Sequence, residues 1–149
     1  MQQLSRLLSA LWAVTALTLF CPIAFADDQE EARSEAAAHL LQAELALQGS
    51  NYLEATQEYR KAAQVSESVD VARQATRVSY SFGFNDEALL AARRWLELDE
   101  GSDEALLYVA QLQLRLGDMR KARRNFRKLI ERGDEDADQR LLSLVQVLS

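Results

Sequence analysis

The sequence predicts an all-α fold in which antiparallel helix pairs are stacked into a repeating array. The first observation is a period of about 34 residues, which is typical of solenoids built from helix pairs. The period is marked by three glycines and three alanines: Gly49, Gly83, Gly117, Ala55, Ala88 and Ala122. Apolar residues also recur with a helical period, and no proline follows Pro22. Helices joined by short turns are therefore expected along the chain.

The first three expected helices each carry an apolar face and end at a turn. The helix over 28–48 opens with acidic residues, which favour a helix N-terminus, and Gly49 is expected to end it. The helix over 52–65 has one apolar face formed by Tyr52, Ala55, Tyr59 and Ala62. The helix over 68–82 carries Val71, Ala75, Val78 and Phe82, and Gly83 follows it. Their alanines are expected where paired helices approach closely.

The remaining helices continue the period. In the helix over 85–98, Trp95 is expected to fill the volume that the small Ala92 leaves. The helix over 103–116 is the most apolar, and Ser102 or Asp103 can cap it. In the helix over 119–132, the side chains expected to face the core are those of Ala122, Phe126, Leu129 and Ile130. A seventh helix, over 134–149, opens with acidic residues and repeats the pattern of 103–116 without a mate.

Two stretches resemble the second-helix signature of tetratricopeptide repeats (TPRs). They are Tyr52-x-x-Ala55-x-x-x-Tyr59-x-x-Ala62 and Gly117-x-Met119-x-x-Ala122-x-x-x-Phe126-x-x-Leu129. The resemblance covers residues 36–149, with repeats at about 36–66, 68–100 and 102–133 and a partial copy at 134–149. It implies a right-handed α-solenoid of three helix pairs plus one unpaired helix. It also implies a concave groove that binds a protein or peptide.

The same resemblance assigns the groove to the first helix of each pair. The implied lining is Leu40, Glu44, Leu47, Arg73, Arg77, Tyr80, Leu107, Gln111 and Leu114. Apolar anchors around two arginines suit a peptide that bears a carboxylate, because arginine binds a carboxylate bidentately. A simpler alternative is that the arginines are only solvated and that some of the leucines belong to the core. The carboxylate-clamp subtype is excluded, since Leu40, Glu44 and Gln111 do not match its Lys and Asn positions.

The N-terminal segment has the layout of a secretory signal peptide. An apolar run over residues 7–20 follows Arg6, and the small residues Ala24 and Ala26 predict cleavage before Asp27. The expected domains are therefore a signal peptide over 1–26 and a repeat domain over 27–149. Export to the periplasm or outside the cell follows. Alternatives are an uncleaved membrane anchor, since residues 7–26 carry no charge, or a lipid anchor at Cys21.

The composition of residues 27–149 argues against several functions. These residues include 16 basic and 23 acidic side chains, a net charge of −7, which disfavours nonspecific binding of nucleic acid. They contain no cysteine, so thiol catalysis and disulfides are excluded. His39 is the only histidine, which leaves no metal site or catalytic dyad, and it is expected at the surface or between helices. We expect no enzyme activity and no cofactor.

Two charged clusters are explained more simply as helix features than as sites. The basic run over 120–128 is typical of a solvated outer helix face, although an acidic partner or an anionic lipid surface would also fit it. The acids over 134–138 begin like a calcium loop. However, Gln139 stands where such a loop requires glycine, and Val145 stands where it requires a bidentate glutamate. Acids at a helix start explain this cluster better.

The last expected helix has too much apolar surface for the end of an array. Its apolar residues cover more than half of the circumference of the helix: Leu141, Leu142, Leu144, Val145, Val147 and Leu148. They predict contact with a partner, a second copy or further repeats. The sequence thus predicts a non-enzymatic scaffold or adaptor in the bacterial cell envelope. The alternative is a structural assembly module that uses this helix, and a concentration-independent monomer in sedimentation would remove self-association.

Overall fold

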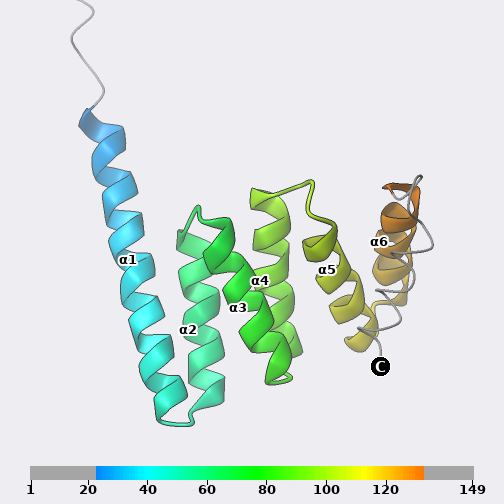
Figure 1. Cartoon of the computed structure of the whole chain (residues 1–149), viewed down its shortest axis with the longest axis horizontal. Coiled ribbons are helices and arrows are strands. Elements are labelled where there is room, and N and C mark those ends of the chain that lie inside the picture. The colour runs from blue at the N-terminus through cyan, green and yellow to red at the C-terminus, as the bar shows by residue number, and fades with distance from the viewer. Residues whose placement is uncertain (1–22, 133–149) are drawn as a thin grey trace, which may run out of the picture. The chain divides into compact units, whose positions relative to one another are not determined.

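The computed structural model describes residues 23–132, and six α-helices make up this part of the chain (Figure 1). They are α1 (Ile23–Gln48), α2 (Tyr52–Val65), α3 (Val69–Ser81), α4 (Asn85–Leu98), α5 (Asp103–Arg115) and α6 (Met119–Arg132). No strand occurs within this range, so the predicted all-α fold is confirmed there. The expected helix over 134–149 and its six apolar residues lie outside the described residues.

The helix boundaries agree closely with those expected from the sequence. α2, α4 and α6 have the expected ranges, and α3 and α5 differ by a residue at their ends. α1 instead begins at Ile23, five residues before the expected start. The predicted cleavage site before Asp27 falls within the range of α1 and stays a prediction. No helix in the described range is both long and apolar enough to cross a membrane.

The helices from residue 32 onward pack as successive pairs. One compact unit of the chain ends at Glu31 and the next begins at Ala32, and the packing described here is that of residues 32–132. Short turns join α1 to α2, α3 to α4 and α5 to α6, and these turns lie at the same edge of the array (Figure 1). α2 packs against both α3 and α4, and α4 packs against α5. The second helices α2 and α4 thus contact the first helix of the next pair.

The repeated alanines lie where helices approach closely, as predicted. Seven alanines at these positions are buried, with at most 1% of their surface exposed: Ala43, Ala55, Ala62, Ala75, Ala88, Ala110 and Ala122. The large side chains of Tyr59 and Trp95 are also buried and share a core cluster with the smaller residues around them. A second cluster joins Ala88 and Ala92 to Val109 and Leu112. The core therefore combines many small alanine side chains with a few large aromatic ones.

The three turns within the pairs share one geometry, in which a residue just past the first helix has a left-handed backbone. Gly83 (φ 78°) and Gly117 (φ 82°) hold this position in the later pairs, but Ser50 (φ 59°) holds it in the first. The next residue donates its N–H to a carbonyl five residues back, as Asn51 does to Ala46 at 2.8 Å. This is a Schellman motif. Gly49 directly follows the last residue of α1, as expected, but Ser50 and not Gly49 is the equivalent of Gly83.

Because serine has a Cβ, Ser50 adopts this left-handed conformation at an energetic cost that glycine avoids. We expect Ser50→Gly to raise the free energy of unfolding by about 1 kcal/mol, as measured by urea denaturation. The reciprocal Gly83→Ser is expected to lower it by a similar amount. Nothing lies within 4 Å of a Cβ built on Gly83, so that loss would report backbone strain and not a clash. A destabilised Ser50→Gly protein would contradict this account of the turn.

One expected inward residue is on the surface. Ile130 has 57% of its surface exposed, whereas Ala122 on the same helix is buried and Phe126 and Leu129 are half-buried. The inward placement of Ile130 was therefore wrong within the described part of the chain. Tyr52 and Phe82 also differ from simple core residues, since each is 42% exposed. Their rings stack on each other at the turn edge, with centroids 4.4 Å apart.

Candidate partner-binding surface

The nine residues implied to line a groove differ in how they are placed. Glu44, Arg77 and Leu114 are exposed on α1, α3 and α5 respectively. Five others are half-buried: Leu40, Leu47, Arg73, Tyr80 and Leu107. Gln111 is only 2% exposed and lies below the surface. Leu40 and Leu47 pack against the core cluster around Tyr59 and Trp95, which agrees with the alternative that some of the leucines belong to the core.

The α3 residues Arg77 and Tyr80 contact α5 directly. Arg77 Nη2 donates to Glu104 Oε1 at 2.7 Å, and the Tyr80 hydroxyl donates to Gln111 Oε1 at 3.2 Å. Arg115 extends from the end of α5 toward Tyr80: its Nη2 donates to the hydroxyl oxygen at 2.7 Å, and its Cζ lies 4.2 Å from the ring centroid. A surface that combines two arginines with an aromatic ring therefore spans α3 and α5.

Tyr108 completes this surface between the two arginines. Its ring meets that of Tyr80 edge to face, with centroids 5.2 Å apart, and lies 6.0 Å from that of Trp95. Burial raises the pKa of Tyr108, and the charge of Glu104 raises it further, so its hydroxyl stays protonated at neutral pH. We call Arg77, Tyr80, Glu104, Tyr108 and Arg115 the α3–α5 surface.

The remaining predicted residues connect α1, α2 and α3. The buried Tyr59 of α2 donates its hydroxyl to Glu44 Oε1, and Gln74 Nε2 donates to the same hydroxyl oxygen at 3.2 Å. Burial, together with Glu44, raises the pKa of Tyr59 to about 12. Arg73 pairs with Asp70 of its own helix, and its Cζ lies 5.9 Å from the Trp95 ring centroid. Glu44 and Arg73 therefore already have partners within the fold.

Sequence reasoning missed three residues of the α3–α5 surface: Glu104, Tyr108 and Arg115. The repeat could have indicated Tyr108. This residue lies one repeat of 34 residues after Gln74, whose side chain contacts the buried Tyr59 of the neighbouring helix. The ion pair between Arg77 and Glu104 joins residues 27 apart, and the contact between Tyr80 and Arg115 joins residues 35 apart. Neither spacing equals the repeat, so these contacts depend on how α3 and α5 pack.

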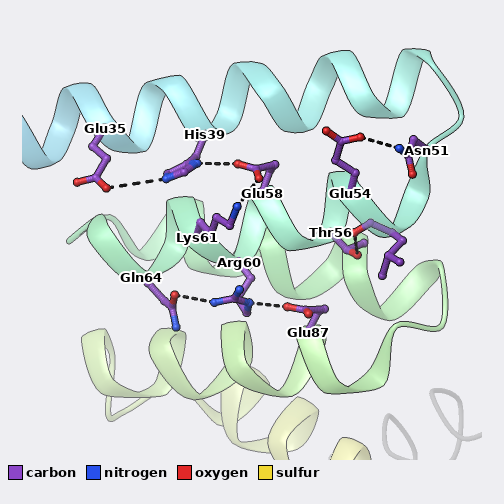
Figure 2. Close-up of polar contacts among 11 residues, drawn as sticks. Glu35, His39, Asn51, Glu54, Thr56, Glu58, Arg60, Lys61, Gln64 and Glu87 are labelled. Carbon is purple, nitrogen blue, oxygen red and sulfur yellow. Dashed lines mark hydrogen bonds and ion pairs between the residues drawn. The ribbon is translucent and has the colours of Figure 1, made fainter.

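A separate polar cluster links α1 to α2 around a buried glutamate (Figure 2). Glu58 is 8% exposed; one of its carboxylate oxygens lies 2.6 Å from His39 Nδ1, and the other accepts a hydrogen bond from Lys61 Nζ at 2.6 Å. Glu35 lies on the far side of the imidazole, 3.9 Å from His39 Nε2. His39 is therefore an inter-helix residue, as the sequence indicated. Within residues 23–132 no group of side chains is arranged to hold a metal ion.

The Glu58 cluster predicts a pH-dependent contribution to stability. Burial raises the pKa of Glu58, but the hydrogen bonds from Lys61 and His39 outweigh it and leave the pKa below the usual value. A carboxylate with a lowered folded-state pKa stabilises the fold above its unfolded pKa, and this stability is lost as pH falls through the folded value. We expect Glu58→Gln to cost about 2 kcal/mol at pH 7.

Denaturation of Glu58→Gln and the parent protein from pH 7 to pH 3 would check this prediction. The difference in unfolding free energy should shrink below about pH 4.3, where Glu58 in the unfolded parent becomes protonated. Glu67→Gln, at an exposed position, is the matched control and should track the parent at every pH. A Glu58→Gln difference that is constant or grows toward acid pH would show that the carboxylate charge is not the stabilising feature.

The comparisons with known proteins yield a structural similarity only. No protein family matches this sequence, and no curated protein does. Among solved structures, the chain is similar to the TPR domain of OM64 from Arabidopsis, with a TM-score of 0.48 and 14% sequence identity. The similarity covers 77% of this chain and 98% of that one.

Proposed function

We propose that this chain is a non-enzymatic scaffold or adaptor that binds a protein or peptide partner across the first helices of its pairs. Export by a cleaved signal peptide and a place in the bacterial cell envelope are part of this proposal. The repeating helix pairs support it, because such arrays present extended surfaces built from equivalent helices. The single observation that carries it is the α3–α5 surface, where two arginines flank a pair of tyrosines.

The charges of this surface favour a partner that bears carboxylates. The Arg77–Glu104 pair is exposed on both sides, with side chains 52% and 44% accessible, so it contributes little to stability. A carboxylate of a binding partner can therefore replace Glu104 as the ion-pair partner of Arg77 at a small cost in free energy. Arg115 contacts a tyrosine and has no carboxylate partner within the described range. Each arginine can bind a carboxylate bidentately.

The aromatic part of the surface favours an apolar or aromatic side chain beside that carboxylate. Tyr80 and Tyr108 are both half-buried, so each offers an apolar ring face and a polar hydroxyl. Tyrosine and arginine are common anchors of protein interfaces, because they combine large contact area with hydrogen bonding. The expected ligand is therefore a segment of a protein in which a carboxylate is followed or preceded by an apolar residue.

Charge reversal on α3 and α5 tests the proposal. We expect Arg77→Glu with Arg115→Glu to abolish capture of the partner, because two attractive contacts become repulsive. The measurement is quantitative pull-down of envelope proteins with the purified chain, and circular dichroism should show unchanged helicity.

The matched control is Arg33→Glu with Arg93→Glu, which changes the net charge equally at two exposed positions outside this surface. The control should capture the same proteins as the parent. Unaltered capture by Arg77→Glu with Arg115→Glu would reject the α3–α5 surface. Equal loss in the control would attribute binding to net charge instead of to α3 and α5.

A further inference from the structure

The exposed face of α6 carries a concentration of unpaired positive charge. α6 contains seven basic residues and one acidic residue, a net charge of +6, so the rest of the chain has a net charge of −12. Lys121 pairs with Asp118, and Arg132 pairs with Asp103. The other five basic residues form no ion pair within residues 23–132: Arg120, Arg123, Arg124, Arg127 and Lys128.

This arrangement differs from that of the basic residues on α2–α4. Arg60, Lys61, Arg73, Arg77 and Arg94 each lie within ion-pair distance of a carboxylate. Figure 2 shows two of these ion pairs: Lys61 meets Glu58 within α2, and Arg60 of α2 meets Glu87 of α4. Within residues 23–132, most cations of the middle helices therefore have a carboxylate partner, whereas five of the seven on α6 have none. A solvated helix face would not require this difference.

Two exposed apolar side chains lie along the basic face. Met119 is 62% exposed and Ile130 is 57% exposed, although α6 packs against α5 through the buried Ala122. Met119, Arg123, Arg127 and Ile130 are spaced by four, four and three residues, which places them side by side on one helix face. Apolar side chains beside arginines are the features of a helix that lies along a membrane interface.

The chemistry of the basic residues favours phosphate groups. Four of the five unpaired cations are arginines, whose planar guanidinium groups bind phosphate oxygens bidentately. An acidic protein segment would satisfy the charges but would not account for Met119 and Ile130. Charges more than about 8–10 Å away are screened at physiological salt, so the net negative charge of the whole chain does not by itself prevent approach. The local charge of α6 therefore decides the interaction.

We propose that the exposed face of α6 is a docking surface for the phosphate headgroups of an anionic lipid bilayer. Arg120, Arg123, Arg124, Arg127 and Lys128 contact the headgroups, and Met119 and Ile130 enter the boundary between headgroups and acyl chains. The helix lies on the bilayer and does not cross it. The interaction is independent of the proposed partner on the α3–α5 surface.

Co-sedimentation with lipid vesicles tests this proposal. The chain is produced with its own N-terminal segment and used as the host processes it, and mass spectrometry confirms that all variants share one N-terminus. Vesicles containing phosphatidylglycerol should bind the protein, and vesicles of phosphatidylcholine alone should bind much less. Arg123→Gln with Arg127→Gln should lower the partition coefficient about 25-fold, since each neutralised cation near such a surface lowers it about fivefold.

Three controls separate the proposal from its alternatives. Arg33→Gln with Arg93→Gln, which changes the net charge equally elsewhere, should bind phosphatidylglycerol vesicles as the parent does. Met119→Ser with Ile130→Ser should weaken binding to the same vesicles, because insertion requires the apolar side chains. Circular dichroism and thermal melting should show that each variant remains folded.

Several results would overturn the proposal. The parent protein could fail to bind phosphatidylglycerol vesicles, or the Arg123→Gln, Arg127→Gln protein could bind them as well as the parent does. Unchanged binding of Met119→Ser with Ile130→Ser would exclude insertion and with it the lipid assignment. Binding to a soluble polyglutamate peptide without binding to vesicles would assign α6 to an acidic protein instead.

Discussion

Replacement of Trp95 by alanine is expected to lower the free energy of unfolding by about 4 kcal/mol. Trp95 is 2% exposed and belongs to the core cluster that holds Tyr59 and several alanines. It also contacts the ring of Tyr108 and lies under the guanidinium of Arg73. Its removal would leave a large cavity at the centre of the array, and the helices around it can close that cavity only in part.

Urea denaturation followed by far-ultraviolet circular dichroism measures this loss. Leu90→Ala is the matched control on the same helix, because Leu90 is 43% exposed and its truncation opens no comparable cavity. It should cost less than about 1 kcal/mol. Trp95→Phe should fall between the two, since the smaller ring fills part of the volume. A loss for Trp95→Ala no greater than that for Leu90→Ala would show that Trp95 does not fill the core.

Enlargement of a repeated alanine should also destabilise the fold strongly. We expect Ala88→Leu to lower the free energy of unfolding by about 3 kcal/mol, because additional methylene groups in a packed core force side chains and helices apart. Ala88 has no exposed surface and is packed with Val109 and Leu112, which belong to α5. The expected displacement is therefore between the second and third pairs.

Ala37→Leu is the control for the chemistry of this substitution. Ala37 is exposed on α1, so leucine there has room, and its effect should be within about 0.5 kcal/mol. Thermal melting of both proteins gives the comparison directly. If Ala88→Leu were as stable as Ala37→Leu, the repeated alanines would not be needed for close helix packing. The 33- and 34-residue spacing of Ala55, Ala88 and Ala122 would then lack its structural explanation.

The alanine spacing was a better guide to the repeat than the glycine spacing. Ala55, Ala88 and Ala122 follow the left-handed turn residues Ser50, Gly83 and Gly117 by five residues in every pair. Alanine is required at these positions by the contact between helices, whereas the turn conformation is only favoured by glycine. The position of Gly49 therefore gave a spacing of 34 residues where the structural repeat is 33.

The candidate site was predictable in part. Arg77 and Tyr80 were identified because one face of a first helix follows from the repeat, and they are two of the five residues of the α3–α5 surface. The sequence did not identify Glu104, Tyr108 and Arg115. Their contacts with α3 depend on the rotation of α5 relative to α3, which the repeat does not specify. Gln111 was expected at the surface, but it lies beneath Tyr80 with 2% of its surface exposed.

The sequence by itself determined the features that depend on near neighbours along the chain. Helix ranges, the positions of turns and the repeated alanines depend on periodicity and on contacts within a few residues. Only the tertiary structure decided which side chains meet across helices. It paired Arg77 with Glu104, placed Arg115 on Tyr80, buried Glu58 beside His39 and, within residues 23–132, left five of the seven cations of α6 without a carboxylate partner. These contacts depend on the distance and rotation between packed helices, and small changes in either exchange one partner for another.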